Sequence, residues 1–311
     1  MTSNRSTLSL AIVVVVIIGL AGGVEFAYVK ESESTINEVT EVLHIGDCIT
    51  ASKAEASRLG YLSGELHYAV TWISMYSRIC HINETLLSKD TDTSNFSFHL
   101  NKELRCSFHL ERYTTTGQTF KRAAHVISNS LYMIGFQKYN SLFRGVNNFN
   151  YRNRSYFIEY GFFSASRSLR VALRFADGGT VLIFKDMNGV PISNFAQDRF
   201  EYQQDVLGPP NSTFLIDAVT KDKTTISNAL KPYPIWSDVK VPTEIIYLTY
   251  IADDNEKAEA MKQVRPDLPT HFCSFGIPTF RNCCDKPSLA FSTILQITTI
   301  VHFIVSKMMV H

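Results

Sequence analysis

The sequence predicts an α+β fold in which a helical N-terminal part packs on a β-rich C-terminal part. In the first half, apolar residues recur at helical spacing over residues 68–87 and 119–136. From Ser141 onward the chain carries short runs rich in β-branched and aromatic residues, which are typical of strands. The chain is 45% hydrophobic and 12% aromatic, so it can bury a core of its own.

Other segments of the N-terminal half are also expected to be helical. Residues 24–44 are polar and acidic, which predicts either a spacer or a first helix. Residues 51–66 contain good helix formers, and residues 96–112 again favour a helix. Residues 90–95 are expected to form a loop. Because Asn95 stands where a calcium-binding loop needs glycine, no metal site is predicted there.

The C-terminal half is expected to contain short strands joined by turns, with one helical piece at residues 168–175. Asn188-Gly189 predicts a hairpin turn, because both turn positions need positive φ. Asp177-Gly178-Gly179 indicates another turn. Strands are expected at residues 142–146, 156–163, 180–184, 190–192, 205–207, 212–218 and 243–251.

Both ends of the chain are apolar and look like targeting segments. Arg5, an apolar run and the small residues 21–23 predict a signal peptide over residues 1–23, with an uncleaved anchor as the alternative. Residues 286–311 form an apolar tail, which is either a glycosylphosphatidylinositol (GPI) signal or a membrane anchor. We favour the GPI signal because almost nothing follows the apolar run. The main domain is then expected over residues 45–285.

The cysteines and sequons indicate an extracellular protein. The cysteines are six in number and lack C-x-x-C metal spacing, and several N-x-S/T sequons lie outside the apolar ends. We expect the chain on the outer face of the plasma membrane, held by its tail, or secreted. The formal net charge is +1 without a basic run, so no nucleic-acid partner is predicted. The cysteines are Cys48, Cys80, Cys106, Cys273, Cys283 and Cys284, and the sequons begin at Asn83, Asn95, Asn153 and Asn211.

Candidate site residues lie in or beside the strand-like runs of residues 141–210. Arg144 offers a planar, permanently charged fork that suits phosphate or carboxylate. Ser164 and Ser166 bracket a single residue on a strand, so their hydroxyls share one face. Asp205 begins another strand. Each of these residues alone is more often structural or solvated than functional, but polar groups gathered on strands suggest a site.

The order of these residues resembles the ecto-ADP-ribosyltransferases, the GPI-linked or secreted arginine-type mono-ADP-ribosyltransferases. That family carries an arginine on one strand, Ser-Thr-Ser on the next, and Glu-x-Glu before Val-Leu-Ile-Pro. Residues 143–146 (FRGV) resemble the arginine strand, and residues 161–166 (GFFSAS) resemble the serine motif. Residues 189–193 (GVPIS) and 205–210 (DVLGPP) resemble the approach to the glutamate motif and the exit from it.

The resemblance implies an enzyme that takes NAD or NADP as co-substrate and holds no permanent cofactor. It would release nicotinamide and transfer ADP-ribose to a protein side chain or to water. Arg144 would bind the pyrophosphate, Ser164 would orient the ribose or the arginine, and Asp205 would stabilise the positive charge that develops on the ribose. Ser166 and Phe175 would complete the NAD site, although we favour core packing for Phe175.

Two departures from the family pattern bear on activity. Asp205 replaces the catalytic glutamate and is one methylene shorter, and a misplacement of about 1 Å can cost on the order of 100-fold in rate. Gln203 replaces the glutamate that receives an acceptor guanidinium, and a neutral amide cannot make that charge-assisted pair. We therefore expect reduced activity and weak arginine specificity. The alternatives are an NAD glycohydrolase and a catalytically impaired cell-surface protein that binds NAD or a protein.

The resemblance also extends to a disulfide. Residues 46–48 and 282–283 resemble two segments that the family joins, which implies a bond between Cys48 and either Cys283 or Cys284. We further expect Cys80 to pair with Cys106, although composition alone leaves the connectivity open.

Overall fold

A computed structural model describes residues 27–82, 95–106, 115–147, 149, 155–196, 202–233 and 238–264. The chain divides into two compact units, Met1–Phe275 and Gly276–His311, and all of the described residues belong to the first. The predicted signal peptide, the apolar tail, the sequons at Asn83 and Asn153, and Cys273, Cys283 and Cys284 lie outside the described residues. They stay predictions.

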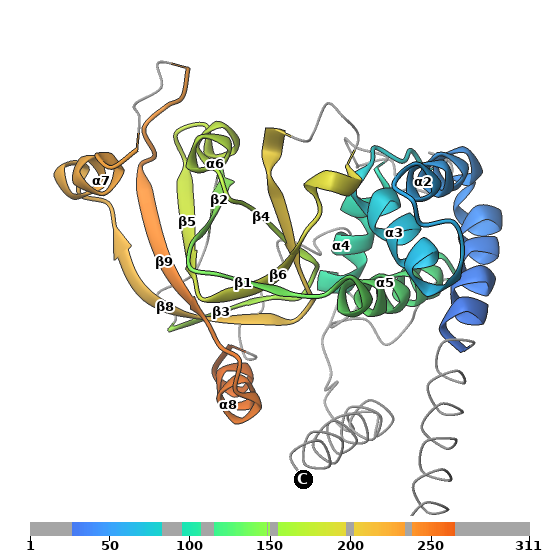
Figure 1. Cartoon of the computed structure of the whole chain (residues 1–311). Helices are drawn as coiled ribbons and strands as arrows, with labels where there is room; N and C mark the ends of the chain where they lie inside the picture. The colour runs from blue at the N-terminus through green and yellow to red at the C-terminus, as the bar shows by residue number, and fades with distance from the viewer. Residues whose placement is uncertain are drawn as a thin grey trace, which may run out of the picture. The chain divides into compact units, whose positions relative to one another are not determined.

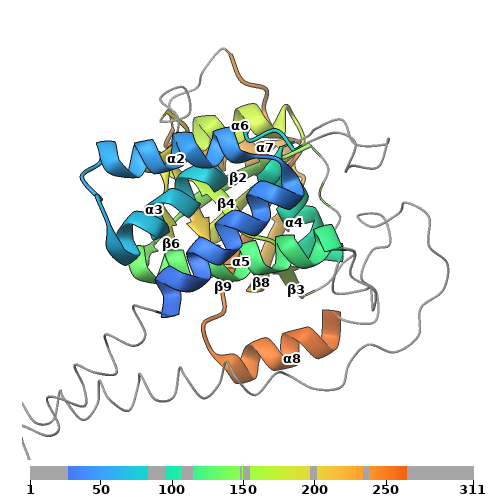
Figure 2. The same ribbon diagram turned by 90° about the vertical axis from the view of Figure 1, so that its right-hand side faces the viewer.

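The α+β prediction is confirmed: helices fill the N-terminal part and strands dominate the rest (Figure 1). Figure 1 shows the N-terminal helices grouped beside the sheet, and Figure 2, viewed from that side, shows them in front of the strands. Their buried residues form one hydrophobic cluster with residues of the sheet, including Val190 and Leu207. After a helix at residues 27–43, the N-terminal helices are α2 (Gly46–Arg58), α3 (Gly64–Ser77), α4 (Phe96–Cys106) and α5 (Thr115–Ile134).

The first helix belongs to the folded core. Ile36, Val39 and Leu43 recur at helical spacing and are buried in the helical cluster. The Tyr28 hydroxyl lies 2.8 Å from the Ser130 hydroxyl of α5, which satisfies both buried polar groups. A spacer over residues 24–44 is therefore the wrong alternative for residues 27–43, because one face of this segment is apolar despite its acidic average.

The strands form a nine-stranded sheet in the described part of the chain, in the order β1-β6-β7-β4-β2-β5-β9-β8-β3. All pairs are antiparallel except the parallel pair β5 and β9. Three further helices accompany the sheet: α6 (Leu169–Ala176), α7 (Lys223–Leu230) and α8 (Asp254–Val264). The strands are β1 (Gln137–Tyr139), β2 (Leu142–Val146), β3 (Tyr156–Glu159), β4 (Phe163–Ser166), β5 (Thr180–Lys185), β6 (Met187–Pro191), β7 (Asp205–Gly208), β8 (Ser212–Thr220) and β9 (Glu244–Tyr250).

The hairpin turn expected at Asn188-Gly189 is wrong. Both residues lie inside β6, which pairs with β1 and β7 and not with β5. The chain turns between β5 and β6 at Asp186, whose φ is 55°. Gly189 serves packing instead of a turn, because a Cβ there would lie 2.4 Å from Val206 Cγ1 on β7. The turn expected at residues 177–179 is confirmed, with positive φ at Asp177 and Gly178.

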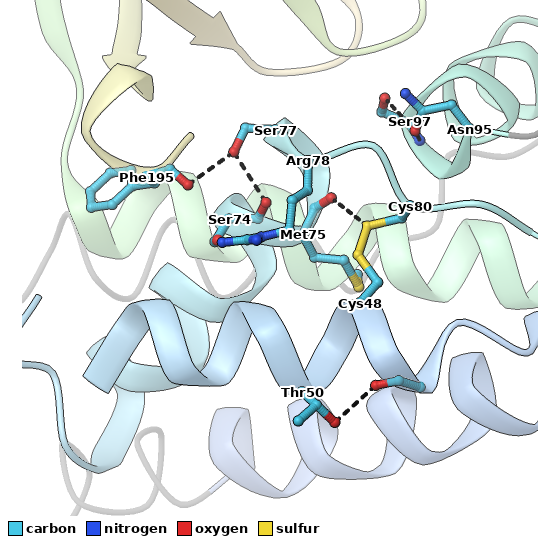
Figure 3. Close-up of a disulfide and its surroundings, with 11 residues drawn as sticks. Cys48, Thr50, Ser74, Met75, Ser77, Arg78, Cys80, Asn95, Ser97 and Phe195 are labelled. Atoms are coloured by element: carbon cyan, nitrogen blue, oxygen red, sulfur yellow. Dashed lines mark hydrogen bonds between the residues drawn. A yellow bond between two sulfur atoms is a disulfide. The ribbon is translucent and has the colours of Figure 1, made fainter. Parts of the chain in front are cut away.

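The predicted disulfides of Cys48 and Cys80 are wrong, because these two cysteines bond to each other (Figure 3). Their Cα atoms are 5.6 Å apart, a usual separation for a disulfide. The bond joins the start of α2 to the segment that follows α3. The helices α2 and α3 pack against each other. Neither cysteine is then available to Cys106, Cys283 or Cys284. The two cysteines are 32 positions apart in the sequence, and no sequence pattern indicated that they would lie close together.

Among the described residues there is no helix long and apolar enough to span a membrane. Within the same ranges, His, Cys, Asp and Glu side chains form no cluster that could hold a metal ion.

Candidate active site

A cleft of about 260 Å³ lies between α6 and the strands β2, β4 and β7. The site residues proposed from the sequence lie between Arg144 and Asp205, which are 61 positions apart, and all of them line this cleft. Its lining consists of Phe143, Arg144, Gly145, Val146, Ser164, Ala165, Ser166, Val171, Ala172, Phe175, Gln203 and Asp205. The family motifs therefore converge in space.

The sheet opens at the cleft. Strands β2 and β5 pair over five positions, whereas β2 and β4 pair at the single position Phe143–Ser166. β2 and β4 therefore diverge after one paired position, which leaves room for a ligand between them. α6 lies directly on β2, because a Cβ on Gly145 would come within 1.8 Å of the Ala172 carbonyl oxygen. This close approach brings Phe175 of α6 to the cleft.

Arg144 presents a cation to the cleft from β2. Its Nη1 donates to Glu159 Oε2 at 3.4 Å, and its Cζ lies 5.2 Å from the centroid of the Phe163 ring. The side chain remains 26% exposed. A guanidinium held along one side and open on the other can still bind an anion such as pyrophosphate.

Asp205 is the half-buried carboxylate of the cleft. Within the part of the chain that the structure describes, its carboxylate has no hydrogen bond or ion pair. Burial raises the pKa of the carboxyl from 3.8 to about 6, and the charge of Arg144 offsets this only in part. A carboxylate without a partner, partly withdrawn from water, is well suited to stabilise positive charge on a ligand.

The two serines of the motif differ in what their hydroxyls can do. Ser164 is half-buried, lines the cleft and makes no hydrogen bond among the described residues. Ser166 is buried, donates to the Gln203 carbonyl and accepts from the Ser168 backbone N–H at 2.9 Å. Ser164 is free to bind a ligand. The Ser166 hydroxyl instead holds the segment before Asp205, which argues against its expected contact with NAD.

The segment before Asp205 is tied to the end of β4. Besides the Ser166 bond, the Arg167 backbone N–H donates to the Gln204 carbonyl at 3.2 Å. Gln204 has a φ of 51°, in the left-handed region that non-glycine residues seldom adopt. The Gln203 side chain lines the cleft, and its Nε2 lies 3.5 Å from the hydroxyl of the exposed Tyr202. The neutral amide therefore sits beside Asp205 at the cleft, where the family places a carboxylate.

Phe175 is not a core residue, contrary to our expectation. Its side chain is 55% exposed, although it lies on the helix α6, whose opposite face is buried. The helical spacing of Leu169, Ala172 and Ala176 explains this orientation, because these residues face the sheet and leave Phe175 on the outer side. An aromatic ring at the cleft can stack on a planar ligand.

Sequence analysis missed two charged residues behind the cleft. Glu159, the last residue of β3, accepts from both Arg144 and Arg105 of α4. Burial alone would raise the pKa of the Glu159 carboxyl, but the charges of the two arginines outweigh it and hold the pKa below its ordinary value. A glutamate inside an apolar strand-like run was the available signal. Nothing in the sequence linked it to Arg105, 54 positions away.

Comparisons with known proteins agree with the motifs. The model of a family described as NAD:arginine ADP-ribosyltransferase matches residues 86–233. No curated protein sequence matches the chain.

Solved structures of ADP-ribosyltransferases are similar to this chain at low sequence identity. The eukaryotic mono-ADP-ribosyltransferase ART2.2 is 15% identical, with a TM-score of 0.49 over 73% of this chain and 88% of that one. Exoenzyme S of Pseudomonas aeruginosa is 14% identical, with a TM-score of 0.47 over 71% and 89%. HopU1 of Pseudomonas syringae is 15% identical, with a TM-score of 0.42 over 60% and 77%. The family model and the motifs together make residues 86–233 similar to the NAD:arginine ADP-ribosyltransferase family.

Proposed function

We propose that this chain is an enzyme that transfers ADP-ribose from NAD to an acceptor and releases nicotinamide. The observation that carries the proposal is that Arg144, Ser164 and Asp205 line one cleft although they come from three different strands. NAD is a co-substrate in this reaction, and the enzyme needs no resident cofactor for it. NADP, which carries the same reacting bond, is a second candidate donor.

The chemistry follows from the charges in the cleft. The bond between nicotinamide and the ribose C1′ breaks, its electron pair leaves with nicotinamide, and positive charge develops on the ribose. Asp205 has an unpaired carboxylate to stabilise that charge. Arg144 binds the pyrophosphate, Ser164 holds the ribose, and Phe175 offers a ring for the nicotinamide. The acceptor then attacks C1′ and loses its proton.

Asp205 limits the rate in this proposal. Its carboxylate is one methylene closer to the backbone than that of a glutamate, and the Ser166 bond to Gln203 holds the preceding backbone in place. A segment tied in this way is not free to shift and compensate for the shorter side chain. We therefore expect Asp205→Glu to raise the rate of nicotinamide release.

Gln203 bears on the acceptor. The side chain lines the cleft next to Asp205 but carries no charge, so it offers an incoming guanidinium no ion pair. We therefore propose weak selectivity for arginine. Hydrolysis of NAD is the second candidate activity, because water needs no guanidinium-binding group.

We further propose that the protein acts outside the cell, on the plasma membrane through its apolar tail or in secreted form. The apolar ends and the sequons support this proposal, and the bond between Cys48 and Cys80 fits an oxidising compartment.

The test is nicotinamide release from NAD by the purified protein, with and without a small guanidinium acceptor such as agmatine. We expect release by the wild type, a higher rate for Asp205→Glu and about a 100-fold lower rate for Asp205→Asn. Asp254→Asn, on an exposed carboxylate of α8, is the matched control and should retain the wild-type rate. Absence of release from both the wild type and Asp205→Glu would refute an enzyme. Strong, saturable transfer to agmatine would refute weak arginine selectivity.

A further inference from the structure

A cluster of two arginines and one glutamate joins the helical part of the chain to the cleft. Arg105 comes from α4, Glu159 from the end of β3, and Arg144 from β2. Arg105 binds Glu159 with two hydrogen bonds, Nε to Oε1 at 2.8 Å and Nη2 to Oε2 at 3.1 Å. Arg144 makes one longer contact, from Nη1 to Oε2 at 3.4 Å. The glutamate is thus shared unequally between the two cations.

Glu159 is fixed more firmly than a surface carboxylate would be. Its side chain is only 7% exposed, and its Oε1 also accepts from the Gly161 backbone N–H at 3.0 Å. Removing one partner from a buried carboxylate leaves part of its charge uncompensated, which destabilises the folded protein. This cost favours a closer contact between the carboxylate and the partners that remain. Without Arg105, Arg144 would be the arginine left to neutralise Glu159.

The cluster of Arg105, Glu159 and Arg144 carries a net charge of one positive unit. Two guanidinium groups and one carboxylate sum to +1, and the fork of Arg105 already engages both carboxylate oxygens. Arg144 lines the cleft and is 26% exposed, so the surplus charge is accessible to an anion there. If Glu159 instead paired fully with Arg144, the charge available to a ligand would fall towards zero.

We propose that Arg105 is a positioning residue, which occupies Glu159 and thereby keeps Arg144 available for the pyrophosphate of NAD. Arg105 does not line the cleft, and its hydrogen bonds to Glu159 connect it to Arg144. The inference rests on the proposed function, because it assigns Arg144 to the pyrophosphate. It adds that a helix of the N-terminal part determines how tightly the dinucleotide binds.

The decisive variants are Arg105→Met alone and Arg105→Met combined with Glu159→Gln. In the single variant, Glu159 pairs with Arg144 and competes with the pyrophosphate. We expect the Kd of ADP-ribose and the KM of NAD to rise about tenfold, with a smaller change in kcat. In the double variant the competing carboxylate is gone and the net charge of +1 returns, so both constants should recover to within about threefold of the wild type.

The probes separate this role from a structural one. ADP-ribose, measured by calorimetry, carries the pyrophosphate, whereas nicotinamide carries no phosphate and should bind all variants alike. Arg122→Met is the matched control. Arg122 is also a helix arginine that pairs with a glutamate, Glu38, and neither residue lines the cleft. A purely structural role for Arg105 predicts a lower melting temperature without a selective loss of ADP-ribose binding. Equal ADP-ribose binding by the wild type and Arg105→Met would overturn the inference.

Two further outcomes keep the test decisive. If Arg105→Met does not fold, Arg105→Lys retains the charge but loses the two-pronged contact, and we expect a rise of about threefold in the Kd of ADP-ribose. An unchanged Kd in that variant contradicts the inference. If the wild type binds neither NAD nor ADP-ribose, the proposed function fails and this inference fails with it. If the wild type binds and the variants do not differ from it, only the inference fails.

Discussion

At the scale of single residues, the cleft combines the carboxylate of Asp205, which has no ion-pair partner among the described residues, with the guanidinium of Arg144, which contacts Glu159. Asp205 has no bonded partner in the described structure, and burial raises the pKa of its carboxyl to about 6. Arg144 is held by Glu159 but remains open to the cleft. Within the described part of the chain, the free site therefore contains a carboxylate without an ion-pair partner and an arginine that Glu159 neutralises only in part. In the proposed function, these two groups receive the positively charged ribose and the pyrophosphate of NAD.

The raised pKa of Asp205 predicts an acid limb in the pH profile. The ionised carboxylate is the active form, so kcat/KM for nicotinamide release should fall about tenfold from pH 7.5 to pH 5. In the NAD complex the cationic nicotinamide favours the ionised carboxylate, so the kcat profile should fall at lower pH. An unchanged kcat/KM down to pH 5 would contradict the pKa assigned to this group.

Acid unfolding caused by Asp205 does not explain such a limb. The pKa is higher in the folded protein than its ordinary value of 3.8, so the folded state binds this proton more tightly. The contribution of the group to stability is therefore fully present below about pH 4 and is lost as the pH rises through 6. Circular dichroism at pH 5 is the control and should show the folded protein.

At the scale of elements, the packing of α6 on β2 shapes the cleft. Gly145 lets the helix backbone contact the strand, and Ala172 and Ala176 are the helix residues nearest to it. Arg144 and Gly145 are consecutive residues of β2, so one strand supplies both the helix contact at Gly145 and the cation at Arg144.

Gly145→Ala should displace α6 or unfold the domain. The new Cβ would lie 1.8 Å from the Ala172 carbonyl oxygen and 2.4 Å from the Ala176 nitrogen, both rigid backbone atoms. Overpacking of this kind costs about 1–3 kcal/mol or more, measured as the free energy of unfolding in urea. Gly46→Ala is the control, because its Cβ would meet only the Thr40 methyl at 3.4 Å. Equal stability of the two variants would show that α6 does not approach β2 so closely.

At the scale of the whole domain, the helical part and the sheet are joined by polar contacts that lie behind the cleft. Asn101 of α4 accepts from the Phe162 backbone N–H at 2.7 Å and donates to the Tyr76 hydroxyl of α3 at 2.8 Å. Burial raises the pKa of Tyr76 to about 12, so this hydroxyl stays protonated. Ser77 of α3 donates to the Phe195 carbonyl at 3.2 Å, near the segment that leads to Asp205 (Figure 3). The N-terminal helices therefore support the site as well as the fold.

The disulfide between Cys48 and Cys80 should stabilise this helical part. It closes a loop with a sequence separation of 32 residues, for which chain entropy gives about 3–4 kcal/mol. Replacing both cysteines by serine should lower the free energy of unfolding by about this amount, and non-reducing peptide mapping should recover Cys48 linked to Cys80. A map that links Cys48 to Cys283 or Cys284 would restore the pairing implied by the family resemblance.

Much of the fold could be predicted because local periodicity carries it. The helix α5 and the strands β2, β5 and β9 match the expected segments closely, since each has a regular apolar pattern. The single strand expected over residues 156–163 instead covers all of β3 and the first residue of β4, with Gly161 between the two strands. Asn188-Gly189 failed as a turn because tertiary packing against Val206 decided its conformation.

The sequence by itself determined the fold class, the resemblance to the ADP-ribosyltransferases and the polar residues that line the cleft, because residue types and the order of the motifs can be read without coordinates. The tertiary structure decided which of these residues are available: Ser164 is free and Ser166 is bonded, and Phe175 is exposed although we expected it in the core. It also decided the Cys48–Cys80 bond and the contact of Arg105 with Glu159. These features depend on distances between segments remote in the chain, and local pattern does not encode such distances.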